Sequence, residues 1–92
     1  MKITRSVLFD KDVKKLNDKE LLELLDKAVS LFTADKQHPS LHTKHITCRQ
    51  EKNLYSFRVN KNYRVLFIDY RTHIELYRLL NHSKYDRLTK RC

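Results

Sequence analysis

Hydrophobic residues recur at helical spacing in the first third of the chain. The main stripe comprises Leu21, Leu25, Ala28 and Phe32, with Leu22 and Val29 beside it. Asn17 precedes this stripe and Glu20 follows three residues later, which is the capping-box pattern of a helix N-terminus. The pattern predicts a helix from Asn17 to about Phe32, with an apolar face and a charged face.

A shorter helix is predicted upstream of this one. Val13 and Leu16 lie three residues apart, and the carboxylate of Asp10 can cap a helix that contains them. Residues 3–8 alternate weakly between apolar and polar side chains and predict an opening strand. The two predicted helices would form a hairpin with a shared apolar stripe.

The period changes from helical to alternating after the polar loop at residues 35–40. Four strands are predicted, at residues 41–47, 54–60, 63–70 and 73–80. Residues 65–68 are apolar on both faces, which is typical of a central strand. The chain has no glycine, so we expect the tight turn at residues 60–62 to use an asparagine in the left-handed conformation.

This order of elements predicts an α+β fold. The N-terminal helical hairpin would pack on one face of a four- to five-stranded, mainly antiparallel sheet. Residues 82–91 would follow the last strand as a loop or short helix. Ninety-two residues are enough for one modest core, so a single domain, residues 1–92, is predicted.

Positive charge is concentrated in the second part of the chain. Residues 1–36 carry eight Lys/Arg and seven Asp/Glu, whereas the remaining residues carry twelve and four, so +8 of the net +9 lies there. All five histidines lie there too. An excess of Lys/Arg can serve solubility alone, but a one-sided basic surface is typical of a protein that binds a polyanion. The segregation favours a nucleic-acid partner.

The sequence also indicates a compartment. No apolar run approaches the roughly 20 residues of a membrane span, and the first residues lack the apolar region of a signal peptide. Cys48 and Cys92 can form one bridge at most, and we expect both to be free thiols in a reducing environment. The predicted location is the cytoplasm, without membrane contact.

Four residues have the chemistry that RNA cleavage needs. Arg58 and Arg64 lie in neighbouring predicted strands, and His82 and Tyr85 lie just beyond the last one. Guanidinium groups hold phosphate oxygens as a planar fork, and imidazole and phenol can donate or accept a proton. Each residue also has an ordinary structural explanation, since strand arginines are often solvated, tyrosines often cover a core and single histidines are often surface groups.

The chain resembles the RelE/ParE superfamily of bacterial toxins from toxin–antitoxin pairs. The resemblance extends over nearly the whole chain, and its most specific parts are residues 55–67, with arginines six apart, and the motif His82-x-x-Tyr85. It implies a microbial-ribonuclease-like fold and, for the RelE branch, cleavage of messenger RNA, commonly on the ribosome. It also implies a cognate antitoxin that covers the active surface, with operator DNA bound only through the toxin–antitoxin complex.

The resemblance also implies roles for individual residues. Arg64 matches the position of a catalytic arginine, and Arg58 matches a neighbouring position that contacts RNA phosphate. His82 resembles a C-terminal acid or transition-state contact, with Tyr85 as its partner or as a base-stacking group. The arginines would stabilise the phosphorane while His82 transfers a proton, and the general base stays unassigned. The predicted RNA contacts are Lys44, His42, His45, Lys61, Tyr63, Lys84 and Arg87.

A second group has the chemistry of zinc ligands. It comprises His38, His42, His45 and Cys48, within eleven residues. The spacing fits no strong zinc pattern, and a strand over residues 41–47 would place His42 and His45 on opposite faces. We therefore predict no metal and no other cofactor.

Two further functions compete with a ribonuclease toxin. One is a toxin of the ParE branch, which inhibits DNA gyrase and lacks the nuclease residues. The other is an inactive member that only binds an antitoxin. The motif His82-x-x-Tyr85 favours the nuclease.

Overall fold

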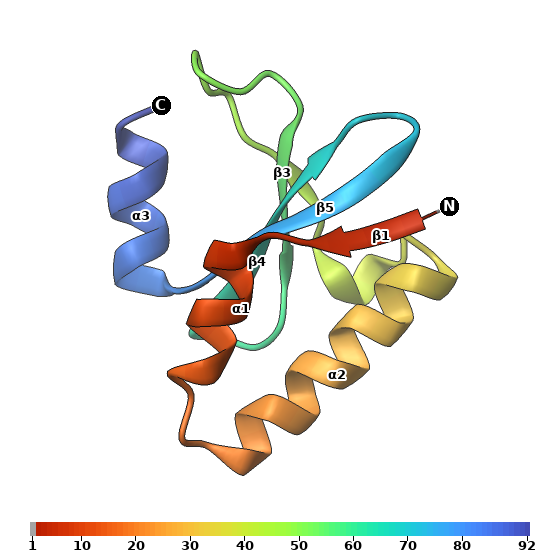
Figure 1. Cartoon of the computed structure of the whole chain (residues 1–92), viewed down its shortest axis with the longest axis vertical. Helices are drawn as coiled ribbons and strands as arrows, with labels where there is room; N and C mark the ends of the chain where they lie inside the picture. Colours follow the sequence, from red (N-terminus) through yellow and green to blue (C-terminus); the bar gives the residue numbers. More distant parts are fainter. Residues whose placement is uncertain (1) are drawn as a thin grey trace.

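A five-stranded mixed sheet forms the centre of the fold, and helices lie on both of its faces (Figure 1). The computed structural model describes residues 2–92. Its elements are β1 (Lys2–Arg5), α1 (Val7–Lys14), α2 (Lys19–Ala34), the 3₁₀ helix η1 (Pro39–Leu41), β2 (Lys44–His45), β3 (Leu54–Arg58), β4 (Tyr63–Asp69), β5 (His73–Asn81) and α3 (His82–Lys90). The strand order is β1-β5-β4-β3-β2, with β1 parallel to β5 and the other pairs antiparallel. The predicted α+β fold with a mainly antiparallel sheet is confirmed.

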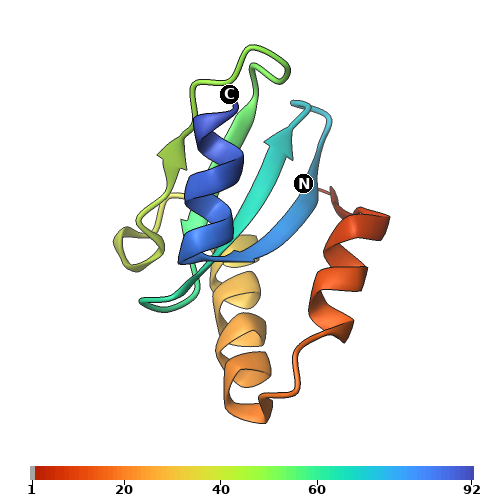
Figure 2. The ribbon, with the colours of Figure 1, turned by 90° about the vertical axis from the view of Figure 1, so that its left-hand side faces the viewer.

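The two N-terminal helices begin at caps other than those predicted. Ser6 caps α1 by accepting a hydrogen bond from the Phe9 amide, and its hydroxyl donates to the Tyr77 carbonyl over 2.6 Å. This tie to β5 ends β1 at Arg5, so the strand predicted over residues 3–8 was too long and Asp10 is not the cap. Asp18, rather than Asn17, caps α2. Figure 2 shows the resulting helical hairpin.

The hairpin covers one face of the sheet with aromatic packing. The core cluster on this face comprises Phe9, Leu25, Ala28, Phe32, Leu41, Phe57, Val65, Phe67, Ile74, Leu76 and Leu79. Phe32 of α2 stacks on Phe57 of β3 with ring centroids 4.6 Å apart, and the ring of Phe67 lies 4.7 Å from that of Phe32. Packing of the predicted α2 stripe therefore fixes the helix on β3 and β4.

A second core cluster lies on the opposite face, because successive strand residues point to opposite sides. It comprises Ile46, Cys48, Leu54, Leu66, Ile68, Leu80 and Tyr85. Residues 65–68 are buried on both faces, which confirms the prediction that they form a central strand. The hairpin covers one face as predicted, and residues 82–90 form a helix, α3, that brings Tyr85 onto this second face.

The loops differ from the sequence-based expectation in two places. The strand predicted over residues 41–47 is only Lys44–His45, because η1 buries Leu41 and His42 then turns in the left-handed region at φ 47°. At the turn of residues 60–62, the side chain of Asn60 accepts hydrogen bonds from the amides of Asn62 and Tyr63. No asparagine of residues 2–92 is left-handed; the two non-glycine positions that are left-handed there are His42 and Arg71.

The two cysteines form a disulfide, Cys48–Cys92, so the prediction of free thiols was wrong. The physical reason is the path of α3, which crosses the second face and brings its end to the segment between β2 and β3. The Cα atoms of the two residues lie 4.1 Å apart although they are separated by 44 positions. Within residues 2–92, no helix is long and apolar enough to cross a membrane.

Candidate active site

The β3–β4 hairpin places Arg58 and Arg64 directly opposite each other. They form the last pair of the β3–β4 register, next to the turn at residues 60–62. Residues opposite each other in an antiparallel pair point to the same face, with Cβ atoms about 5 Å apart. Both arginines are half-buried. The hairpin therefore places the two arginine positions side by side at its turn end.

Arg64 lies over the aromatic ring of Tyr85. Its guanidinium carbon is 5.3 Å from the ring centroid, a cation–π contact. Tyr85 is 8% exposed, and its hydroxyl lies 3.4 Å from Oγ of the fully buried Ser56. The tyrosine is therefore a covering residue of the second core that also supports Arg64.

His82 begins α3 and lies at the same end of the sheet as Arg64. The residue before it, Asn81, pairs in register with Tyr63, the neighbour of Arg64, and caps α3 by accepting from the Lys84 amide. The side chain of His82 is 65% exposed. The histidine is thus accessible to a ligand bound beside the two arginines.

The structure places His82 beside Asp86 rather than beside Tyr85. Nε2 of His82 lies 3.3 Å from a carboxylate oxygen of Asp86, one helical turn further on. Tyr85 instead turns inward, and in this structure it is too buried to stack on a base. Both positions adjoin His82 on the helix surface, but Tyr85 turns toward the sheet whereas Asp86 stays exposed beside the histidine.

The predicted RNA contacts divide between the two faces. Lys44 pairs in register with Ser56 and shares the face of α3, Lys61 is exposed in the hairpin turn, and Lys84 and Arg87 are exposed on α3.

The other three predicted contacts do not join them. His45 packs its ring on Tyr55, 4.9 Å away, and Tyr63 packs against the first core, on the opposite face. His42 is exposed beside η1.

Three of the four residues considered as zinc ligands have other partners. Nδ1 of His38 accepts from the Ser40 amide, Nε2 of His45 lies 2.9 Å from the Lys52 carbonyl, and Cys48 is in the disulfide. Nowhere in residues 2–92 do three His, Cys, Asp or Glu side chains gather in a way that could hold a metal ion.

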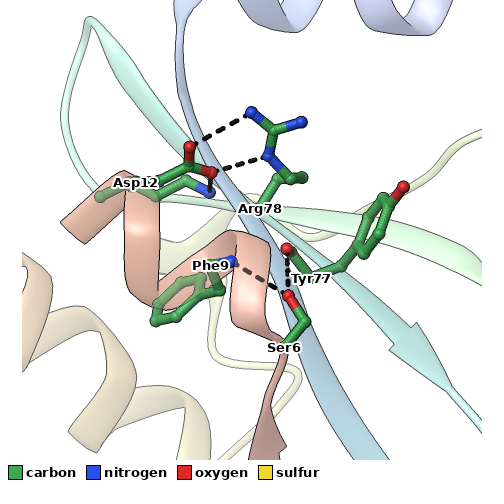
Figure 3. A network of polar contacts seen from close by, with 6 residues as sticks. Ser6, Phe9, Asp12, Tyr77 and Arg78 are labelled. Atoms are coloured by element: carbon green, nitrogen blue, oxygen red, sulfur yellow. Dashed lines mark hydrogen bonds and ion pairs between the residues drawn. The ribbon is translucent and has the colours of Figure 1, made fainter. Parts of the chain in front are cut away.

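The sequence did not reveal an ion pair that joins α1 to β5. Asp12 accepts hydrogen bonds from Nε of Arg78 over 2.7 Å, from a terminal nitrogen of the same guanidinium over 3.2 Å, and from the Leu79 amide over 3.0 Å (Figure 3). The hydrogen bond to Asp12 raises the pKa of Arg78 above its ordinary value. No local pattern could have predicted this pair, because its members are 66 residues apart.

Solved structures of toxins share this fold. YafQ from E. coli strain BL21(DE3) matches with a TM-score of 0.75 and 14% identity, over 90% of this chain and 94% of that chain. YafQ in the E. coli DinJ–YafQ complex matches with a TM-score of 0.74 and 16% identity, over 89% of this chain and 93% of that chain. A chain of the RelB–RelE antitoxin–toxin complex from Methanococcus jannaschii matches with a TM-score of 0.69 and 20% sequence identity, over 91% of this chain and 96% of that chain. The fold is that of the RelE- and YafQ-like toxins.

The sequence supports a more particular assignment. The model of the ParE-like toxin domain matches residues 23–87, and the chain belongs to this family, within the RelE/ParE toxin superfamily. The matched span runs from α2 through most of α3, and so contains the arginine pair as well as His82 and Tyr85. No curated protein matches the chain.

Proposed function

We propose that this protein is an endoribonuclease that cleaves messenger RNA and thereby inhibits translation in the cytoplasm. The observation that carries the proposal is the arginine pair, Arg58 and Arg64, beside the exposed imidazole of His82 at one end of the sheet. Membership of a toxin family supports the inhibitory role. Lys44 and Lys61 extend the positive surface around the pair.

The proposed chemistry follows from these groups. A base removes the proton of the ribose 2′-hydroxyl, the oxygen attacks the adjacent phosphorus, and an acid protonates the departing 5′-oxygen. Arg64 and Arg58 bind the phosphate oxygens and stabilise the charge of the phosphorane, which is often the largest contribution to such rates. His82 transfers one of the two protons, and Asp86 orients its ring.

Tyr85 acts in this scheme through Arg64. Its ring lies under the guanidinium and limits the conformations that the arginine can adopt before RNA binds. Such preorganisation increases the stabilisation that a charged group gives to a transition state. Tyr85 is therefore proposed as a positioning residue rather than as an acid or a base.

The proposed partners are messenger RNA on the ribosome and a cognate antitoxin. One chain of the RelB–RelE antitoxin–toxin complex from Methanococcus jannaschii shares the fold of this protein. This similarity supports an antitoxin partner here. Binding to operator DNA would occur only through the toxin–antitoxin complex. A small acidic protein with a DNA-binding end, encoded beside this gene, is the expected antitoxin.

Loss of single side chains tests the chemistry. Arg64→Ala and His82→Ala should each reduce cleavage of messenger RNA on programmed ribosomes by about a hundredfold or more. Lys14→Ala, which removes an exposed cation from α1, is the matched control and should retain wild-type activity. Arg64→Ala also loses its contact with the Tyr85 ring, so its melting temperature should fall by a few degrees, while those of the other two variants should be unchanged. Full cleavage by either site variant would remove that residue from the site.

Induction in cells separates the nuclease from a gyrase inhibitor, a function suggested by the ParE-like family. A messenger-RNA nuclease should stop incorporation of labelled amino acids within minutes of induction, while DNA supercoiling is maintained. Loss of supercoiling with continued amino-acid incorporation would instead assign the protein to gyrase inhibition. No effect on either would favour an inactive antitoxin-binding protein.

A further inference from the structure

A basic groove runs between β5 and α3, separate from the proposed active site. It has a volume of about 290 Å³ and is lined by Arg78, Leu80, Lys84, Arg87, Leu88 and Arg91. Four of these six residues are cationic and none is acidic. Leu80 and Leu88 belong to the second core or pack against it. The groove is therefore a shallow, open depression with positively charged walls and two leucines in its lining.

The helical period separates this groove from the arginine pair. Lys84 and Leu88 of α3 and its C-cap residue Arg91 lie at positions i, i+4 and i+7, with Arg87 beside them, so they form one stripe. Tyr85 is directed elsewhere, toward Arg64 and Ser56.

The two sites are nevertheless close. Leu80, which lines the groove, is the register partner of Arg64, so one strand spacing of about 5 Å separates the two positions. A polymeric ligand that contacts Arg64 can therefore continue into the groove.

Arg78 is held rigidly at the wall of the groove. Asp12 binds its Nε–H and one terminal N–H, and a guanidinium has five such donors, so three remain for a ligand. Asp12 is itself fixed by the Leu79 amide, and Ser6 anchors the start of α1 to Tyr77. In Figure 3 the guanidinium projects from β5 toward α3.

This arrangement suits a phosphate group. A planar guanidinium with fixed donors matches phosphate oxygens. Asp12 already orients the Arg78 guanidinium, so little conformational entropy is lost when a phosphate binds. Asp12 neutralises Arg78, but Lys84, Arg87 and Arg91 still give the groove three positive charges. A series of cations along one helix face matches a ligand with regularly repeated negative charge.

We propose that this groove binds phosphates of the RNA backbone at positions outside the scissile one, and that Asp12 positions Arg78 for this contact. The inference rests on the proposed ribonuclease function and adds a binding region to it. The groove holds RNA in register while the arginine pair and His82 perform the chemistry. Its residues should therefore determine affinity and salt dependence, and Arg64 and His82 should determine the rate at saturation.

The test measures the salt dependence of RNA binding. The probe is a single-stranded RNA with a 2′-deoxy nucleotide at the scissile position, so that it binds without being cleaved. Arg87→Ala/Arg91→Ala should lower the slope of log affinity against log salt by about 1.4, since each single-strand phosphate contact contributes about 0.7. Lys14→Ala/Lys19→Ala, which removes two exposed charges from α1 and α2, is the matched control and should leave the slope unchanged.

Equal slopes for the groove variant, the control variant and the wild type would overturn the proposal. Unchanged RNA binding with weaker binding of a polyglutamate peptide would overturn it and assign the groove to an acidic protein segment. The proposed function can fail separately. If Arg64→Ala retains full cleavage while the groove variant shows the smaller slope, the groove binds RNA but the chemistry assigned to Arg64 is wrong.

Substitutions at Arg78 and Asp12 test the positioning. Arg78→Lys retains the positive charge but not the planar guanidinium. It should therefore bind RNA several-fold more weakly than the wild type, and so should Arg78→Ala. Asp12→Asn should weaken RNA binding even though it adds one net positive charge beside the groove, because Arg78 is then no longer held in position. Thermal unfolding identifies any of these variants that is misfolded, and the Arg87/Arg91 result is then decisive. Wild-type RNA affinity in a folded Asp12→Asn variant would remove the positioning role.

Discussion

The guanidinium of Arg64 lies 5.3 Å above the ring of Tyr85, and this contact joins the central strand to the C-terminal helix. The ring is almost completely buried, so it cannot move without disturbing the second core. Arg64 is thereby held against a rigid aromatic surface. Packing of α3 and orientation of the proposed catalytic arginine are consequently coupled.

Two substitutions of Tyr85 should distinguish the contribution of its ring to cleavage activity from that of its hydroxyl. Tyr85→Phe keeps the cation–π contact and loses only the long hydrogen bond to Ser56, so cleavage activity should fall by less than about threefold. Tyr85→Leu removes a contact of about 0.5–2 kcal/mol and should lower the cleavage rate by about threefold to thirtyfold. Ribosome-dependent cleavage and thermal unfolding would be measured together, and equal rates for the two variants would show that the ring does not position Arg64.

Reduction of the disulfide should destabilise the protein. A loop closed between positions 44 apart restricts the unfolded chain, and the entropic estimate for that length is roughly 4 kcal/mol. Scanning calorimetry with and without a thiol reductant should show a lower melting temperature in the reduced form. Cys92→Ser should melt at the reduced temperature and should not respond to the reductant. A wild-type melting temperature that is independent of the reductant would contradict a disulfide in solution.

Removal of Asp12 should weaken the link between α1 and β5. Asp12→Ala leaves the Arg78 guanidinium and the Leu79 amide without their partner, which should cost about 1–3 kcal/mol in the free energy of unfolding. Urea unfolding of this variant beside Asp10→Ala, an exposed carboxylate of the same helix, provides the comparison.

The Asp12–Arg78 contribution has a defined dependence on pH. The folded-state pKa of Arg78 is raised, so the stability that this shift contributes is fully present below the ordinary arginine pKa and is lost only as the pH rises through the folded value. The stability difference between wild type and Arg78→Ala should therefore not decrease between about pH 7 and pH 10. A decrease over that interval in urea titrations would contradict the assignment.

The proton-transfer role of His82 predicts a change in the pH–rate profile. His82→Gln should flatten the dependence of the cleavage rate on pH, because a glutamine amide cannot transfer the proton. Asp86→Asn should leave stability within about 0.5 kcal/mol, because the pair is exposed, while lowering the rate through a less ordered ring. A profile of unchanged shape in His82→Gln would exclude His82 from proton transfer.

Truncation in the aromatic core should be the most destabilising of these changes. Phe32 is fully buried between Phe57 and Phe67, so Phe32→Ala should cost about 3–5 kcal/mol. Leu24→Ala on the same helix, where the side chain is 37% exposed, should cost much less. Similar losses in the two variants, measured by urea unfolding, would contradict the packing of α2 on β3 and β4.

The sequence by itself determined the local features of this protein. The apolar stripe of α2 and the doubly apolar residues 65–68 record which faces are buried, because helices and strands repeat with different periods. The turn at residues 60–62 also set the register of the hairpin, so six residues of spacing were enough to bring Arg58 and Arg64 together. Charge segregation and the family motifs are likewise properties of the chain.

The tertiary structure decided the contacts between distant segments. Whether Tyr85 meets Ser56, Cys48 meets Cys92 or Asp12 meets Arg78 depends on how α1 and α3 dock on the sheet. Sequence periodicity reports that a residue is buried, but not which partner it is buried against, since partners 29, 44 or 66 positions away have no fixed spacing. For this reason the sequence identified the catalytic candidates, whereas only the packing of α3 showed that Tyr85 supports Arg64 and that a basic groove lies beside it.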